Sequence, residues 1–205
     1  NLGLMYIKGI GVPKDYSQAA SWFQKSAEQG DNRSQYLLGL MFNSGEGVEQ
    51  DYGKGASWLT KSAEQGNAFA QFNLGDMYIK GDGVSKDDNQ AFHWFRKSAE
   101  QGNAEAQSYL GFMYNRGRGV PQNYSQATDW FRKAAEQGDA YAQYNLGLMY
   151  FNGEGLPQNY SQAASWFRKA GTQGHSDSLN NLGLGYEFGQ YGAKNLVLAH
   201  FFYNL

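Results

Sequence analysis

Apolar and polar positions follow one another along this chain with the spacing of amphipathic helices. In the stretch NAFAQFNLGDMYIKG, residues 67–81, the side chains of Ala70, Leu74 and Met77 fall on one side of a helical wheel. Gly75 lies at the flank of that side. The pattern predicts a helix that turns its Ala, Leu and Met positions toward a core.

The same pattern returns every 36 residues. Tryptophan marks the period at Trp22, Trp58, Trp94, Trp130 and Trp166, with Phe202 in the sixth place. The complete units are residues 31–66, 67–102, 103–138 and 139–174, and partial units cover residues 1–30 and 175–205. Each unit predicts two helices joined by a Gly-x-Gly loop. One helix pair cannot bury its apolar face alone, so we expect the units to stack in a row.

Capping residues stand at the expected helix boundaries, since Asp and Asn supply the acceptor that a first helical turn needs. Before the first helix of a unit stand Asp31, Asn67, Asn103 and Asp139, with His175 as a poorer substitute. Before the second helix stand Asp15, Asp87, Asn123 and Asn159, each followed three residues later by Gln. This second pattern predicts a variant of the capping box.

A glycine interrupts the middle of every first helix, at Gly3, Gly39, Gly75, Gly111, Gly147 and Gly183. Glycine costs a helix interior about 1 kcal/mol relative to alanine, so its recurrence needs a reason. Because these glycines lie on the packed side of the wheel, we expect a close approach of the bulky Trp and Phe of the neighbouring helix.

These residues resemble the Sel1-like repeat, a relative of the tetratricopeptide repeat. The pattern A-x-A-Q-x-x-L-G-x-M-Y-x-x-G-x-G-V, then Q-A-x-x-W-F-x-K-A-A-E-Q-G, is almost complete in residues 103–138. The resemblance implies an all-α fold, a right-handed α/α superhelical solenoid of helix-turn-helix repeats forming one domain over residues 1–205. It also implies that the first helices line a concave surface and that the protein is an adaptor, in bacteria often tied to the envelope, secretion or host contact.

The sixth unit departs from the pattern. Leu179 replaces the usual Gln, Gly185 replaces Met, and the sequence FGQYGAKN replaces the Gly-x-Gly loop. We therefore expect a different loop geometry there. A cysteine-rich branch of the family staples each hairpin with a disulfide, and this chain has no cysteine, so it does not belong to that branch.

The charge and the apolar runs of the chain limit the classes of partner that it can bind. The net charge is −2 and no Lys/Arg cluster occurs, whereas a nucleic-acid surface needs concentrated positive charge. No apolar run approaches the roughly 18 residues that a membrane-spanning helix needs. We therefore expect no nucleic-acid ligand and no membrane span.

The chain lacks the motifs of the common active sites. It has no G-x-G-x-x-G or Walker sequence, no H-E-x-x-H, no G-x-S-x-G and no S-x-x-K. The three histidines, His93, His175 and His200, share no helical face, and a zinc site needs three or four converging ligands. We therefore expect no catalytic residue, no cofactor and no metal site.

Sequence differences between units concentrate at positions i, i+4, i+7 and i+11 of the first helix, which form one stripe. This variable stripe holds Arg33, Leu37, Leu40 and Ser44, then Phe69, Asn73, Asp76 and Lys80, then Glu105, Tyr109, Phe112 and Arg116, then Tyr141, Asn145, Leu148 and Asn152. By resemblance it faces the concavity. Its mixture of aromatic, apolar, charged and amide groups is typical of a protein- or peptide-binding groove.

Asparagine recurs at one stripe position, at Asn73, Asn145 and Asn181 and also at Asn1. It is a poor helix former, but its amide can donate to and accept from a peptide backbone at once. We hypothesise that these amides clamp the main chain of an extended ligand, with Tyr109 and Phe112 as apolar pockets. Alternatively, the stripe varies only because it is exposed to solvent.

Three classes of function follow. The leading one is a non-enzymatic scaffold that binds a protein or peptide. The second is self-association through exposed terminal repeats, because a terminal repeat without a polar cap can dock onto another copy. The third, an enzyme acting on the cell wall or on β-lactams, is disfavoured because no nucleophile or acid–base group is apparent.

Overall fold

The structure is a computed structural model that describes residues 2–204, a range with twelve helices and no strand. The chain divides into two compact units, one ending at Asn103 and the other beginning at Ala104. The first unit holds α1 (Leu2–Lys8), α2 (Tyr16–Glu28), α3 (Asn32–Ser44), α4 (Tyr52–Glu64), α5 (Ala68–Lys80) and α6 (Asp88–Glu100). The second holds α7 (Ala104–Arg116), α8 (Tyr124–Glu136), α9 (Ala140–Asn152), α10 (Tyr160–Gly171), α11 (Ser176–Glu187) and α12 (Leu196–Tyr203).

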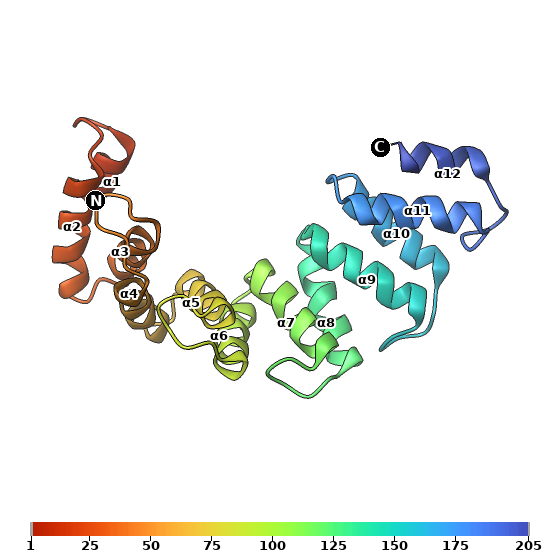
Figure 1. Cartoon of the computed structure of the whole chain (residues 1–205), viewed down its shortest axis with the longest axis horizontal. Coiled ribbons are helices and arrows are strands. Elements are labelled where there is room, and N and C mark those ends of the chain that lie inside the picture. The colour runs from red at the N-terminus through yellow and green to blue at the C-terminus, as the bar shows by residue number, and fades with distance from the viewer. Residues whose placement is uncertain (1, 205) are drawn as a thin grey trace. The chain divides into compact units, whose positions relative to one another are not determined.

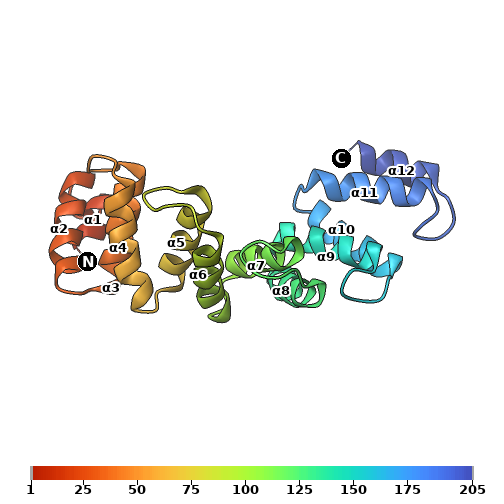
Figure 2. The same cartoon turned by 60° about the horizontal axis from the view of Figure 1, so that its bottom comes forward.

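Within each unit every helix packs against the next helix along the chain, as Figures 1 and 2 show. Odd-numbered helices are the first helices of the repeats and even-numbered helices are the second. In the second unit the first helices α7 and α9 also contact each other directly. The predicted all-α solenoid of helix pairs is thus confirmed, while the assignment of residues 1–205 to one domain stays a prediction.

Asp and Asn side chains cap the helices as predicted. Asp31 Oδ1 accepts a hydrogen bond from the Ser34 N–H at 2.7 Å, whereas His175 Nδ1 lies 3.4 Å from the Ser178 nitrogen. Asp51 also caps α4, accepting from the Lys54 N–H at 2.9 Å. The Asp/Asn-x-x-Gln spacing did not indicate this cap, because Lys54 stands where α2, α6, α8 and α10 carry Gln.

The predicted capping box is wrong. The Asn123 side chain does cap α8, accepting from the Gln126 N–H at 3.0 Å. However, the Asn123 N–H donates to the Tyr114 carbonyl of α7 at 2.9 Å. The same bond joins Asn159 to Tyr150 in the next repeat. Because a first-helix carbonyl already satisfies this N–H, the Gln side chain is not needed for it.

The first-helix glycines face a bulky apolar or aromatic side chain of the second helix; Phe makes the expected contact, whereas Trp does not. A β-carbon on Gly75 would lie 2.8 Å from Phe95 Cδ1, and Gly39 faces Leu59 in the same way. The corresponding pairs are Gly3 with Phe23, Gly111 with Phe131, Gly147 with Phe167 and Gly183 with Tyr203. The close approach explains why alanine is absent from these positions.

The five tryptophans differ in burial, and only Trp94 is buried. Phe95, Phe131 and Phe167 are fully buried, whereas Trp22 is 39% exposed. Each Trp carries the ammonium group of the Lys three residues later over its ring, at 3.9 Å for Lys169 and Trp166. The Trp rings therefore cover the edge of the core, and the Phe rings fill its centre.

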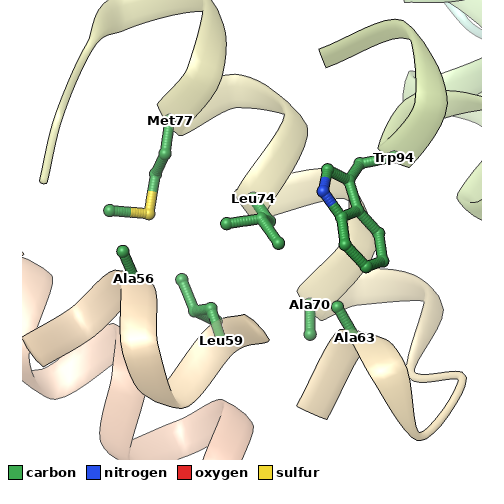
Figure 3. Packing of buried hydrophobic residues seen from close by; sticks show 7 residues of the cluster. All are labelled: Ala56, Leu59, Ala63, Ala70, Leu74, Met77 and Trp94. Carbon is green, nitrogen blue, oxygen red and sulfur yellow. The ribbon is translucent and has the colours of Figure 1, made fainter. Parts of the chain in front are cut away.

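A core cluster joins three helices of the first unit. Figure 3 shows Leu74 of α5 between Leu59 of α4 and Trp94 of α6, with Met77 beside Ala56. These side chains come from two successive repeats, so the core is continuous across the joint between them.

The second glycine of the loop also serves the joint between repeats at Gly47, Gly83 and Gly155. Gly83 has φ +69°, and a β-carbon there would overlap the Tyr52 carbonyl at the start of α4. Gly155 lies against Tyr124 in the same way. A side chain would force the loop away from the preceding second helix.

A chain of glutamine hydrogen bonds links neighbouring repeats. Gln71 Nε2 donates to the carbonyl of Ala63 in the preceding repeat at 3.0 Å, and Gln101 Nε2 donates to Gln71 Oε1 at 2.8 Å. In the second unit Gln143 binds the Ala135 carbonyl at 3.1 Å and accepts from Gln173 at 2.9 Å. The side chain of Gln71 is buried and cannot bind solvent, so these hydrogen bonds satisfy its amide group.

The last repeat replaces this polar joint by an apolar one. Leu179 stands at the Gln position and packs on Gly171, where a β-carbon would lie 2.6 Å from Leu179 Cδ2. Gly171 occupies the position of Ala135. Leu179 thus replaces the hydrogen-bonding Gln side chain, and the missing methyl group at Gly171 makes room for it.

The loop of the last repeat has the altered geometry that its sequence predicts. The Tyr191 ring occupies the space beside Gly185 that Met fills in the other repeats, and its hydroxyl donates to the Asn181 carbonyl at 3.1 Å. Burial raises the pKa of Tyr191 well above its usual range. Asn195 still caps α12, accepting from the Leu198 N–H at 2.9 Å.

Candidate functional site

The variable stripe carries exposed side chains in both units. In the first unit Phe69 is 61% exposed, and its ring centroid lies 6.2 Å from that of Tyr36. In the second unit Tyr109 and Tyr141 are 38% and 44% exposed. The stripe also carries exposed polar side chains at its ends, Arg33, Lys80, Glu105, Arg116 and Asn152. The first helices therefore present exposed aromatic groups next to charged and amide groups.

Some stripe residues belong partly to the core. Phe112 is half-buried and packs on the cluster around Phe131, and Leu148 packs on the cluster around Phe167. Leu37 is likewise half-buried in the first unit. Only part of each of these side chains faces solvent, so the predicted apolar pocket at Phe112 is shallower than an exposed ring would make it.

The asparagines bind their own helices. Asn73 Nδ2 donates to the Phe69 carbonyl at 2.8 Å, and Asn145 Nδ2 donates to the Tyr141 carbonyl at 2.8 Å. Asn181 does the same with Asp177, while Asn1 lies outside the described residues. One amide N–H is therefore occupied, and Asn145 is only 8% exposed. The amide oxygen and the second N–H are the groups left for the hypothesised clamp.

Charged stripe residues differ between the units. In the first unit Lys80 Nζ lies 2.7 Å from Asp76 Oδ2, so the two charges compensate each other within α5. In the second unit Phe112 occupies the position of Asp76, one turn before Arg116. Arg116 forms no ion pair with any residue in the range 2–204.

Tyr141 marks the place where the stripes of α7 and α9 meet. Burial raises the pKa of its hydroxyl, while a hydrogen bond to Asn145 and the charge of Arg116 oppose that rise. The Tyr109 phenol of α7 also raises the pKa of the Tyr141 hydroxyl through its charge. These four side chains of α7 and α9 therefore share one neighbourhood.

A polar groove of about 240 Å³ opens next to this neighbourhood. We call it the α7–α9 groove, and its lining residues are Asn115, Arg116, Gln122, Tyr124, Asn145, Leu148, Met149, Asn152 and Glu154. Arg116, Asn145, Leu148 and Asn152 belong to the predicted stripe, while the others come from the α7–α8 and α9–α10 connections or lie beside the stripe. The stripe was read from helices alone, so it omitted the loop residues.

A larger hollow of about 370 Å³ lies between α1, α2 and α3. It is lined mainly by apolar and small side chains, among them Leu2, Trp22, Phe23 and Leu37, with Arg33 at its edge. No sequence signal predicted this hollow.

The described residues hold no cluster of three or more His, Asp or Glu side chains that could bind a metal ion. Within residues 2–204, no helix combines the length and apolarity that crossing a bilayer requires.

Comparison with known proteins gives a consistent family. The model of the Sel1 repeat matches residues 1–31, 32–67, 68–103, 104–139, 140–175 and 176–205. The repeat boundaries differ by one residue from those read from the sequence. No curated protein sequence matches the chain.

Solved structures extend this likeness. A protective antigen of uropathogenic Escherichia coli, described as displaying an SLR fold, is 41% identical with a TM-score of 0.94. The match covers 99% of this chain and 44% of the antigen, so the chain spans less than half of that protein's length. A Sel1 repeat protein from Oxalobacter formigenes is 31% identical over 99% of this chain and 81% of its own, with a TM-score of 0.84. An immunity protein from Pseudomonas aeruginosa, 20% identical over 99% of this chain and 80% of its own, has a TM-score of 0.55 and shares the fold alone.

Proposed function

The chain belongs to the Sel1 repeat family, whose members generally serve as protein-interaction scaffolds. From this premise we propose that each of its two units binds an extended peptide segment of a partner protein along its own part of the variable stripe. The observation that carries the proposal is the exposure of the aromatic side chains Phe69, Tyr109 and Tyr141 along a stripe that also holds charged and amide groups. Aromatic anchors surrounded by polar groups are the usual energetic centres of protein interfaces.

The asparagines of the stripe support this role, but with fewer free groups than the sequence indicated. Because Asn73 and Asn145 each use one N–H within their own helix, their amides are held in a fixed orientation. A fixed amide loses little entropy when it binds a peptide group. The clamp thus consists of amide oxygens and remaining N–H groups beside the aromatic anchors.

The proposal is tested by selecting binders from a randomised peptide library on the immobilised chain. A variant with Phe69, Tyr109 and Tyr141 all replaced by Ser should lose at least about tenfold in affinity for the selected peptides. Tyr52→Ser is the matched control, because Tyr52 is 42% exposed but lies on a second helix. Equal loss in both variants, or none in either, would contradict the proposal.

The amides are tested separately. Asn73→Ala combined with Asn145→Ala should weaken peptide binding without lowering the melting temperature. Unchanged affinity would remove the clamp from the proposal and leave the aromatic anchors.

A second candidate function is self-association through α12. Val197 and Phe201 are 81% and 54% exposed, whereas the matching positions of α10 hold Ser161 and Ser165. Light scattering over a concentration series tests it: the molar mass should rise with concentration, and Val197→Ser with Phe201→Ser should abolish the rise. A constant mass contradicts this candidate.

The proposed role is that of a scaffold and not of an enzyme. A nitrocefin assay tests the β-lactam alternative, and turnover that survives rigorous purification would overturn the non-enzymatic assignment.

A further inference from the structure

We propose that the α7–α9 groove accepts an acidic side chain of the bound peptide, with Arg116 as the group that recognises its carboxylate. This inference rests on the proposed function and adds the chemistry of the partner at one position. It starts from a difference between two successive repeats of the second unit.

The groove exists because one position changes from aromatic to amide. Phe151 of α9 packs edge-on against Tyr160, with ring centroids 5.1 Å apart. Asn115 holds the same position in α7, and Tyr124 corresponds to Tyr160. The shorter Asn side chain does not fill the space that the Phe ring fills one repeat later.

The loops around the two positions are otherwise built alike. Gln122 Nε2 donates to the Asn115 carbonyl at 2.8 Å and to the Tyr124 hydroxyl at 3.1 Å. Gln158 makes the same two bonds, to Phe151 and Tyr160, at 2.8 and 3.1 Å. The groove is therefore a local hollow in a regular frame, and its walls are held by hydrogen bonds.

Arg116 brings an uncompensated positive charge to this hollow. The equivalent Lys80 is neutralised by Asp76, one helical turn earlier, at 2.7 Å. Arg116 has Phe112 at that distance along its helix, and it forms no ion pair within residues 2–204. A guanidinium binds a carboxylate through two parallel hydrogen bonds, which makes an acidic side chain its best-matched ligand.

Neighbouring groups suit the same ligand. The Tyr124 hydroxyl accepts from Gln122, so its own proton is left to donate into the groove. The Asn115 side chain makes no hydrogen bond to the described residues and adds two N–H donors. Leu148 gives an apolar floor for the methylene groups of a Glu side chain.

Glu154 lines the same groove and carries the opposite charge. Asn152 Nδ2 lies 3.4 Å from Glu154 Oε1, and no Glu154 oxygen comes within 4.0 Å of Arg116. The carboxylate of Glu154 therefore does not neutralise Arg116, but it repels an acidic ligand. This opposition gives the test two substitutions with opposite expected signs.

The experiment uses peptides selected from a randomised twelve-residue library on the wild-type chain. Selected sequences should carry Asp or Glu at one recurrent position, and changing that residue to Asn or Gln should weaken binding about tenfold. Arg116→Ala should abolish the difference between the acidic and amide peptides, and Arg116→Lys should restore part of it. Glu154→Gln should strengthen binding of the acidic peptide two- to fivefold.

Arg132→Ala is the matched control, because Arg132 lies on the second helix α8 beside Asp129 at 3.4 Å. It should leave the acidic preference unchanged. If peptides bind through the aromatic stripe but Arg116→Ala preserves the preference, the acidic subsite is wrong and the proposed function stands. If no peptide is enriched, the proposed function fails and this inference fails with it.

Discussion

A β-carbon added to Gly111 would lie 2.6 Å from Phe131 Cδ1, so the ring occupies the space that any other residue would need. Every first-helix glycine makes a contact of this kind, with an aromatic ring in five repeats and with Leu59 at Gly39, and the contact sets how closely the two helices of a pair approach. The glycine therefore lowers helix propensity but makes room for a bulky apolar side chain at the centre of the hairpin.

Gly111→Ala should destabilise the protein by about 1–2 kcal/mol, because overpacking outweighs the better helix propensity of alanine. Urea denaturation measures the change. Gly53→Ala is the matched control: Gly53 lies in α4, and a β-carbon there meets only Asp51 Oδ1, at 3.3 Å. This control should be neutral or stabilising, and a stabilising Gly111→Ala would refute the packing argument.

Gln71→Leu should destabilise the first unit by about 1–3 kcal/mol, because it removes two hydrogen bonds, one to the Ala63 carbonyl and one from the Gln101 amide. Adding Ala63→Gly should recover part of the loss, since this pair reproduces the contact between Leu179 and Gly171. Denaturation midpoints of the single and double variants measure the coupling. A double variant no more stable than Gln71→Leu would show that the apolar joint needs further residues.

Asn43 of α3 packs against Gly55 of α4 and leaves a buried amide oxygen without a hydrogen bond within the described range. A β-carbon on Gly55 would overlap Asn43 Oδ1, which is buried and has no hydrogen-bond partner within the described range. The next repeat holds Ile79 and Ala91 at these positions. Gly55→Ala alone should destabilise, whereas Asn43→Ile with Gly55→Ala should stabilise by about 1–2 kcal/mol, because no polar group is then buried unpaired. Thermal melts of the three variants decide it, and a destabilised double variant is the contrary result.

Asp31 should make stability depend on acid pH. Hydrogen bonds from the Ser34 hydroxyl and backbone N–H lower the pKa of the Asp31 carboxyl. The unfolded chain then binds the proton more readily, so this contribution is complete above the ordinary Asp pKa of about 3.9 and is lost as the pH falls through the lower folded value. Asp31→Asn keeps the cap and removes the titration, so its melting temperature should fall less between pH 5 and pH 2. Parallel acid-induced losses in both proteins would contradict this cause.

Much of the frame was readable from the sequence because a repeated contact leaves a repeated residue. The period, the helix pairs, the caps at Asp31 and Asn67 and the glycine contacts all follow from local chemistry that recurs. The Gln three residues after each cap has the spacing of a capping box, which led to a wrong prediction. The N–H of the capping residue instead donates to a carbonyl of the first helix, which the local spacing does not reveal.

The candidate site was predictable only in part. Helical spacing placed Arg116 on the variable stripe of α7 and Asn145 and Asn152 on the stripe of α9. All three side chains line the α7–α9 groove. The loop residues Gln122 and Glu154 were missed, because a wheel drawn on one helix says nothing of the loops beside it. The internal hydrogen bonds of the asparagines depend on rotamers, which spacing does not fix.

The joint between Leu179 and Gly171 also has a consequence for how the array can be rearranged. Repeats joined by glutamine are interchangeable at their borders, so duplication or deletion of a whole unit leaves each seam chemically matched. The last repeat fits only a preceding repeat that has glycine at the position of Gly171, because an alanine methyl there would collide with Leu179. Whole repeats can therefore be exchanged within the series, but the last repeat must keep the neighbour that carries this glycine.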